Sequence, residues 1–146
     1  HDERGYPDMS VACQADLICR LSDKIKKNAD SIARYDEESV EGAEVVVVSY
    51  GITSRVTRAG IDLARRKGVK VGHIRLIVAW PFPESLIRKL SERVQAFVVP
   101  EINLGQMVLE VERCVAGKAK TVSVPHPGGG VHDPAQICEA IVRAVK

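Results

Sequence analysis

The chain has 146 residues, of which 45% are apolar and 27% are charged, as is ordinary for a globular protein with one domain and a sizeable core. Its formal charge of +2 is too small to indicate a nucleic-acid or anionic-membrane partner, and no apolar stretch approaches the length of a membrane span. Aromatic residues make up only 4%, which predicts a core of valine, isoleucine, leucine and alanine.

The cysteines and the amino terminus bear on the cellular setting. None of the four cysteines belongs to a C-x-x-C pair, so isolated thiols are favoured over metal or cluster ligation. Such thiols are typical of a reducing compartment, and no secretory signal is present, so we expect a cytoplasmic protein. The chain begins with His1 rather than methionine, and we expect it to be part of something longer.

Two parts of different character are expected, at residues 1–42 and 43–146. In the first part, an apolar face at helical spacing predicts one helix over residues 9–29. The acidic stretch that follows, residues 31–42, has little apolar content, and we interpret it as a linker.

The second part alternates strand and helix four times. Apolar β-branched runs predict strands at residues 44–50, 69–78, 96–99 and 120–124, with the third stopping at Pro100. Helical spacing predicts helices between them and at the end; Gly68 ends the first, and Asp133 with Gln136 begins the last in a capping box. Short loops between alternating elements require parallel strands, so we expect an α/β fold: a three-layer α/β/α sandwich with a mostly parallel sheet.

The first loop after a strand holds Gly51, Thr53 and Ser54. Free backbone N–H groups at the start of the next helix can hold an anion. A plain turn capped by Thr53 or Ser54 explains the same residues. The loop lacks the G-x-G-x-x-G pattern, so a nicotinamide dinucleotide site is poorly supported.

The second and third loops carry aromatic and amide side chains. Trp80 and Phe82 flank a proline, and they suit either an interface or a rigid turn with Phe82 buried. The third loop can hydrogen-bond a ligand or a neighbouring subunit, or it can cap the next helix, chiefly through Asn103. Its candidate residues are Glu101, Asn103, Gly105 and Gln106.

The fourth loop holds Gly128, Gly129 and Gly130, which permit backbone conformations closed to other residues. It can approach a ligand, form an anion-binding nest, or serve as a flexible or interface loop. His126 and His132 flank the glycines without a third ligand nearby, so no metal site is predicted.

The carboxyl ends of parallel strands meet at one edge of the sheet, where α/β proteins keep their ligand and partner crevices. All four loops therefore point to one binding edge. No nucleophile–base pair can be read from the spacing of Ser49, Ser54 or Cys114, so no catalytic residue is assigned. The residues by themselves indicate a binding or assembly domain.

Four segments of the chain, taken in order, resemble the alpha subunit of 2-oxoacid:ferredoxin oxidoreductases. They are His1–Gly5, Trp80–Pro83, Pro100–Gln106 with Glu110–Arg113, and Gly128–Gly130 before Asp133. The subgroup that looks most similar is the 2-oxoglutarate enzyme, followed by the branched-chain 2-oxoacid enzyme. The resemblance implies a domain like the carboxyl-terminal domain of transketolase, with the first of the four strands between the second and third. It also allows an antiparallel edge strand.

The resemblance further implies a multi-subunit enzyme that oxidatively decarboxylates a 2-oxoacid with coenzyme A. The products are an acyl-CoA, CO2 and reduced ferredoxin. Thiamine diphosphate, Mg2+ and iron–sulfur clusters would be held elsewhere in that enzyme, with no cofactor in this fragment. The fragment alone would be inactive and would serve assembly with other subunits. The alternatives are a pyruvate or branched-chain enzyme of the same group, or an independent ligand-binding α/β module.

Overall fold

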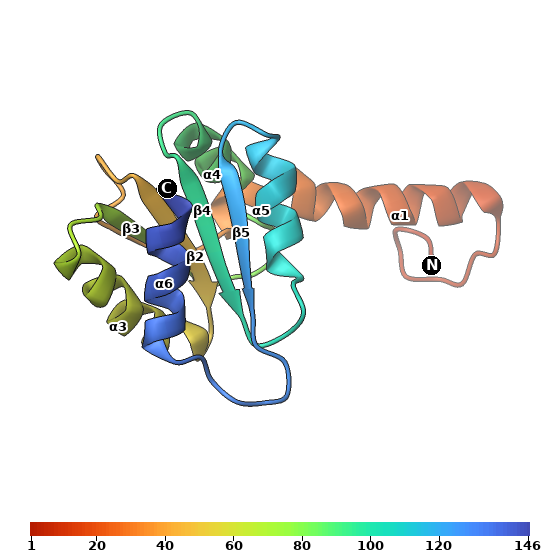
Figure 1. The fold of residues 1–146 in the computed structure, drawn as a ribbon. Helices are drawn as coiled ribbons and strands as arrows, with labels where there is room; N and C mark the ends of the chain where they lie inside the picture. The colour runs from red at the N-terminus through yellow and green to blue at the C-terminus, as the bar shows by residue number, and fades with distance from the viewer.

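The computed structural model describes residues 1–146, which form a five-stranded sheet flanked by helices and preceded by a projecting helix (Figure 1). The strand order is β1-β3-β2-β4-β5. The strands are β1 (Tyr35–Glu38), β2 (Val45–Tyr50), β3 (Val71–Leu76), β4 (Ala96–Glu101) and β5 (Lys120–Pro125). The helices are α1 (Val11–Lys26), α2 (Ala29–Ile32), α3 (Thr53–Arg66), α4 (Glu84–Ser91), α5 (Met107–Val115) and α6 (Pro134–Ala144).

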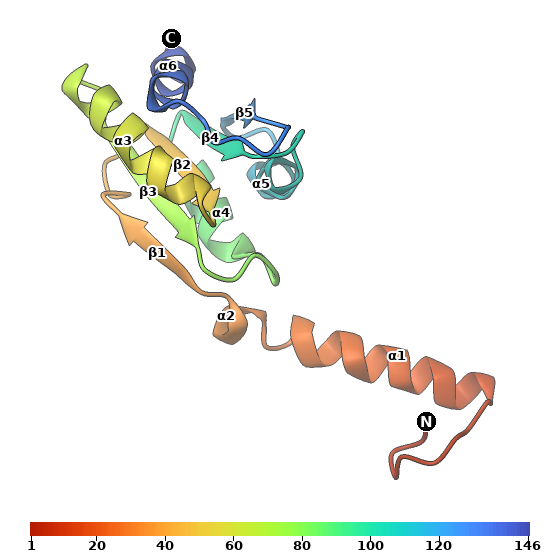
Figure 2. The same cartoon turned by 90° about the horizontal axis from the view of Figure 1, so that it is seen from below.

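Helices cover both faces of the sheet, which confirms the expected three-layer α/β fold. Strands β2 to β5 are parallel, with β2 between β3 and β4 as expected. Figure 2 shows α3 and α6 on one face and α4 and α5 on the other. Each face has its own apolar core because side chains alternate along the strands. Val45 and Val47 of β2 pack toward α3 and α6, whereas Val46 and Val48 pack toward α4 and α5.

One strand lies where a linker was expected, and the expectation is wrong at residues 35–38. There β1 pairs antiparallel with the edge of β3, with Tyr35 opposite Leu76. The pattern of apolar residues does not reveal this strand, because three of its four residues are exposed acids. Charged side chains on an edge strand discourage pairing with other chains. The sheet thus includes residues from before position 43, and the division at 42 and 43 stays a prediction.

Strand β4 also runs further than expected, through Pro100 to Glu101. A proline is tolerated in a strand where its missing N–H is not needed. The ladder between β2 and β4 ends at Val98, so the final residues of β4 pair only with β5.

The expected amino-terminal helix is present as α1, beginning at Val11 rather than residue 9 and ending at Lys26 rather than residue 29. Ser10 caps it by accepting a hydrogen bond of 3.2 Å from the N–H of Cys13. None of its residues is buried, and it extends away from the sheet in Figures 1 and 2. No helix in the chain has the length and apolarity needed to cross a lipid bilayer.

Candidate functional site at the carboxyl edge of the sheet

The loops after β2, β3, β4 and β5 follow the carboxyl ends of parallel strands and so lie at one edge of the sheet, and those after β2, β4 and β5 are seen at the bottom of Figure 1. We call this the carboxyl edge. Each loop exposes at least one large apolar side chain there. These side chains, named here the carboxyl-edge patch, are Ile52, Ile77, Trp80, Ile102, Leu104 and Val131. Exposed apolar groups gathered from several loops are typical of a surface that contacts another protein.

Glu101 lies at the end of β4 and is completely buried. Its carboxylate accepts hydrogen bonds from the backbone N–H groups of Gln106 (3.2 Å), Met107 (2.8 Å) and Val108 (2.9 Å). These donors form the positive end of α5, so the negative charge is stabilised there. The Glu101 carboxylate therefore caps α5, and it is not free to bind a ligand.

Asn103 does not cap α5, contrary to one of the two interpretations offered by the sequence. Its side-chain oxygen accepts a hydrogen bond of 2.7 Å from the N–H of Gly105, and its amide donates to the hydroxyl of Tyr50 at 3.1 Å. Gly105 has a φ of +107°, a conformation that favours glycine. Gln106 is exposed and makes no side-chain capping bond, so it remains available at the surface.

Thr53 and Ser54 do not cap α3 either. The cap position is Ile52, which offers no side-chain acceptor, and both Thr53 and Ser54 are buried. The Ser54 hydroxyl instead accepts a hydrogen bond of 3.0 Å from Ser49 on β2. Gly51 makes the preceding turn with a φ of +58°.

Ser49 has a histidine partner that the sequence spacing concealed. Its hydroxyl lies 2.7 Å from Nε2 of His73, 24 residues away on the adjacent strand β3. Burial, as the largest cause, lowers the pKa of His73 to about 4, and the charges of Arg58, Arg65 and Arg75 lower it further. Glu38 acts in the opposite direction. Ser49 and His73 are both buried, so the pair organises the interior of the site.

Trp80 and Phe82 of the second loop differ in their exposure to solvent. Trp80 is 66% exposed and belongs to the carboxyl-edge patch, whereas Phe82 is buried in the core beneath α4 and α5. The interface interpretation therefore suits Trp80 alone.

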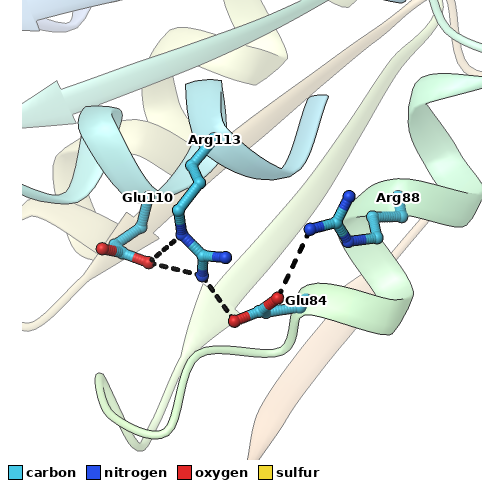
Figure 3. A network of polar contacts seen from close by, with 4 residues as sticks. All are labelled: Glu84, Arg88, Glu110 and Arg113. Carbon is cyan, nitrogen blue, oxygen red and sulfur yellow. Dashed lines mark hydrogen bonds and ion pairs between the residues drawn. The ribbon is translucent and has the colours of Figure 1, made fainter. Parts of the chain in front are cut away.

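The beginning of α4 is tied to α5 by an ion-pair network on the surface (Figure 3). Arg113 binds both Glu84 and Glu110, and Arg88 lies 3.5 Å from the other oxygen of Glu84. The hydrogen bond from Arg113 is the main reason that the pKa of Glu84 is lowered. This network lies between the helices that follow the second and third loops.

The glycine loop is anchored at both ends. At its start, the backbone N–H of His126 donates to the carbonyl of Glu101 at 2.8 Å. At its end, buried His132 donates from Nε2 to the carbonyl of Val124 at 2.7 Å. Gly128, Gly129 and Gly130 between them are exposed. The two histidine rings lie 5.0 Å apart, but no group of three potential metal ligands occurs in the chain.

Three arginines complete this edge, and the sequence interpretation overlooked them. Arg55 and Arg58 on α3 and Arg75 on β3 line a cavity of about 210 Å³ together with Gly51 and Ser54. The sequence did contain a signal for two of them. Arg55 and Arg58 are three residues apart in the helix that follows Gly51, a spacing that places both on one helix face. The contribution of Arg75 depends on the pairing of β2 with β3.

The family model for the pyruvate:ferredoxin oxidoreductase core domain II matches residues 43–137. The chain belongs to this family.

Two curated relatives of the chain are the KorA subunits of 2-oxoglutarate synthases. The subunit from Methanocaldococcus jannaschii is 42% identical over 97% of the chain, and that from Methanothermobacter thermautotrophicus is 41% identical over 98%. The ketoisovalerate oxidoreductase subunit VorB of Methanothermobacter marburgensis is 38% identical over 75% of the chain, which spans 31% of that subunit. The chain spans only 38% of the length of either KorA subunit.

Solved structures share the domain II fold. The 2-oxoglutarate:ferredoxin oxidoreductase from Magnetococcus marinus matches the whole chain with a TM-score of 0.80 at 22% identity, over 26% of its own length. A split-gene transketolase matches 77% of the chain with a TM-score of 0.61 at 17% identity, over 41% of its own length. These likenesses confirm the expected transketolase-like architecture.

The cysteines of the domain II chain do not suit an iron–sulfur cluster. Cys114 lies in the core beneath α4 and α5, and Cys138 lies in the core beneath α3 and α6, so the sheet separates them. Cys13 and Cys19 lie on α1.

Proposed function

We propose that this chain is the carboxyl-terminal part of the alpha subunit of a 2-oxoglutarate:ferredoxin oxidoreductase. The observation that carries the proposal is the 41–42% identity with two KorA subunits, which runs through nearly the whole chain. The complete enzyme would oxidatively decarboxylate 2-oxoglutarate with coenzyme A. It would yield succinyl-CoA and CO2 and pass the electrons to ferredoxin.

Within that enzyme the chain serves assembly and the shaping of the site rather than the chemistry itself. Two of the polar groups at the carboxyl edge, on Glu101 and Asn103, are occupied by bonds inside the chain. What the edge offers to a neighbour is the carboxyl-edge patch, with Gln106 and the glycine loop beside it. The partner is another subunit or domain of the same oxidoreductase.

The cofactors of the enzyme belong to other parts of it. Thiamine diphosphate would supply carbanion stabilisation and the iron–sulfur clusters would carry electrons. The 2-oxoacid, coenzyme A and ferredoxin are then partners of the assembled complex, which we place in the cytoplasm without membrane or nucleic-acid contacts. The chain alone would be inactive.

The test is to purify the full-length subunit together with its partner subunits and to measure reduction of ferredoxin or a viologen dye. We expect reduction that requires both 2-oxoglutarate and coenzyme A. The oxidoreductase assignment would be contradicted if an assembled complex that contains thiamine diphosphate failed to reduce the dye whichever 2-oxoacid was supplied. Binding of a small ligand by the isolated chain would then favour an independent α/β module.

A second candidate is oxidation of a branched-chain 2-oxoacid, because VorB is 38% identical over 75% of the chain. The same assay separates the two when 2-oxoglutarate, 2-oxoisovalerate and pyruvate are compared at equal concentration. We expect 2-oxoglutarate to give the largest kcat/KM. A larger value for 2-oxoisovalerate would assign the chain to the branched-chain group.

The role of the edge is tested by replacing Asn103 and Gln106 with alanine in the full-length subunit. We expect weaker assembly, because Asn103 holds the third loop against Tyr50 and Gln106 faces outward beside it. Unchanged assembly and unchanged turnover in the double variant would show that this loop serves neither function.

A further inference from the structure

A cleft between the beginning of α3 and the end of β3 has a lining with no apolar side chain. The lining consists of Gly51, Ser54, Arg55, Arg58 and Arg75. Arg75 reaches it because alternate residues of β3 face α3: Ile74 and Leu76 are buried in the opposite core, and Arg75 is directed to the other side. The cleft is therefore built by the sheet register and not by one flexible loop.

The arginines of this cleft lack enough negative charge around them. Arg55 and Arg58 form no ion pair within the chain; the charge of Arg58 acts on Glu38, but that carboxylate is hydrogen-bonded to Arg65. Arg75 has one carboxylate neighbour, Asp36, at 3.4 Å, and both of these side chains are about half exposed. Such an exposed pair neutralises little charge. Three guanidinium groups around one cavity repel one another unless an anion lies between them.

A buried hydroxyl, that of Ser54, also lines the cleft. Ser54 is only 3% exposed, and its oxygen accepts the hydrogen bond of Ser49. A serine hydroxyl has one proton, so when Ser49 donates to Ser54 it can accept from Nε2–H of His73 at 2.7 Å. In that arrangement the Ser54 proton is free to donate to an acceptor in the cleft.

The beginning of α3 adds one backbone donor. This 14-residue helix has no side-chain cap, and the N–H groups of Ser54 and Arg55 donate to the carbonyls of Gly51 and Ile52, which leaves the N–H of Thr53 without an acceptor. The positive end of the helix dipole lies at this first turn. Arginine side chains and a hydroxyl thus line one small space at the start of a helix.

We propose that this cleft binds the phosphate group of a small-molecule ligand. A phosphate has oxygens in several directions and can accept from donors on both α3 and β3, whereas a planar carboxylate meets fewer of them. The volume of about 210 Å³ is below that of pockets that enclose a whole drug-sized ligand. The cleft accordingly holds the phosphate while the rest of the ligand lies outside, toward the carboxyl edge.

The test measures amide hydrogen exchange in the intact assembled protein, with inorganic phosphate, ADP or 2-oxoglutarate as the probe. Exchange is read on the peptide that covers residues 51–60. We expect phosphate to slow exchange in this peptide. Since the readout is binding and not turnover, failure here is distinguishable from failure of the oxidoreductase assignment.

Variants connect the protection to the cleft. Arg58→Gln should weaken the affinity for phosphate by about tenfold, which corresponds to the loss of one charge-assisted hydrogen bond. Ser54→Ala should weaken it as well. Arg66→Gln, on the same helix but outside the cleft, should bind phosphate like the unchanged protein. Unaltered exchange elsewhere in the chain would show that each variant is folded.

The three probes separate the sources of the phosphate. Protection by inorganic phosphate and by ADP, each lost in Arg58→Gln, supports a site for the phosphate group itself. Protection by ADP alone supports a phosphate carried by a larger ligand. No protection by either, equal protection by 2-oxoglutarate, or unchanged binding in Arg58→Gln would overturn the proposal.

Discussion

The Glu101 carboxylate accepts a hydrogen bond of 2.8 Å from the backbone N–H of Met107, the first residue of α5. Two further N–H groups donate to the same side chain, which lies at the end of β4. One buried charge therefore joins the central sheet to the helix after the third loop, and Gln106 at the cap position provides no side-chain bond of its own.

Replacing Glu101 should destabilise the chain strongly. In Glu101→Gln the amide nitrogen faces N–H donors, and in Glu101→Ala these buried donors are left unpaired. We expect the free energy of unfolding in urea to fall by about 2 kcal/mol for glutamine and about 3 kcal/mol for alanine. Glu112→Gln, on the exposed surface of α5, should change it by less than about 0.5 kcal/mol. Equal effects at positions 101 and 112 would contradict the capping role.

The lowered pKa of His73 predicts that the folded chain loses stability in acid. Its pKa is about 4 in the folded chain and near 6.5 when unfolded, so the unfolded state binds more protons between these values. Stability from this group is therefore complete above about pH 6.5 and declines as the pH falls toward 4, by about 3 kcal/mol in all. Urea unfolding across this range should show a steeper pH dependence for the unchanged chain than for His73→Gln. Identical slopes would mean that His73 does not titrate in this way.

Leu104 should matter for assembly rather than for folding. It is 80% exposed at the tip of the third loop, so Leu104→Ser removes apolar contact only if another subunit covers it. We expect the affinity between subunits to fall about tenfold, as for the loss of one buried leucine. Leu109→Ser, an exposed leucine on α5, is the comparison. Subunit affinity can be measured by sedimentation, and the proposal for the edge fails if Leu104→Ser assembles normally.

Gly60 should resist substitution even though alanine favours helices. It lies inside α3, where a Cβ would come within 2.8 Å of the Cβ of Ile137 on α6 and 3.0 Å of the carbonyl of Pro134. We expect Gly60→Ala to lower the free energy of unfolding by about 1–3 kcal/mol because the two helices must separate. Ala59, which is exposed on the same helix, provides a neutral site for comparison. A stabilising effect of Gly60→Ala would show that the helices can adjust.

The ion-pair network around Glu84 should contribute little to the stability of the fold. Its side chain and that of Arg113 are each nearly half exposed, so water and salt screen the pair. We expect Glu84→Gln to cost about 0.5 kcal/mol at low salt and nothing measurable at about 1 M NaCl. A cost that persists at high salt would indicate that the network in Figure 3 is more than a surface contact.

Local sequence patterns predicted most of the sheet and its helices. Runs such as Val45–Val48 form strands because β-branched side chains suit a sheet buried on both faces, and Asp133 with Gln136 begins α6 as a capping box. The position of the loops at one edge followed from parallel strands. By contrast, β1 went unrecognised because its acidic side chains carry no apolar pattern.

What the sequence by itself determined about this protein is the alternation of strand and helix and therefore the edge that carries its functional loops. Only the tertiary structure decided which side chains meet there. It paired Ser49 with His73, turned Glu101 inward to hold α5, and brought Arg75 beside Arg58. The physical reason is that propensity and periodicity act between neighbours along the chain. Contacts between distant residues depend instead on strand register, which is set when the two apolar faces of the sheet are buried together.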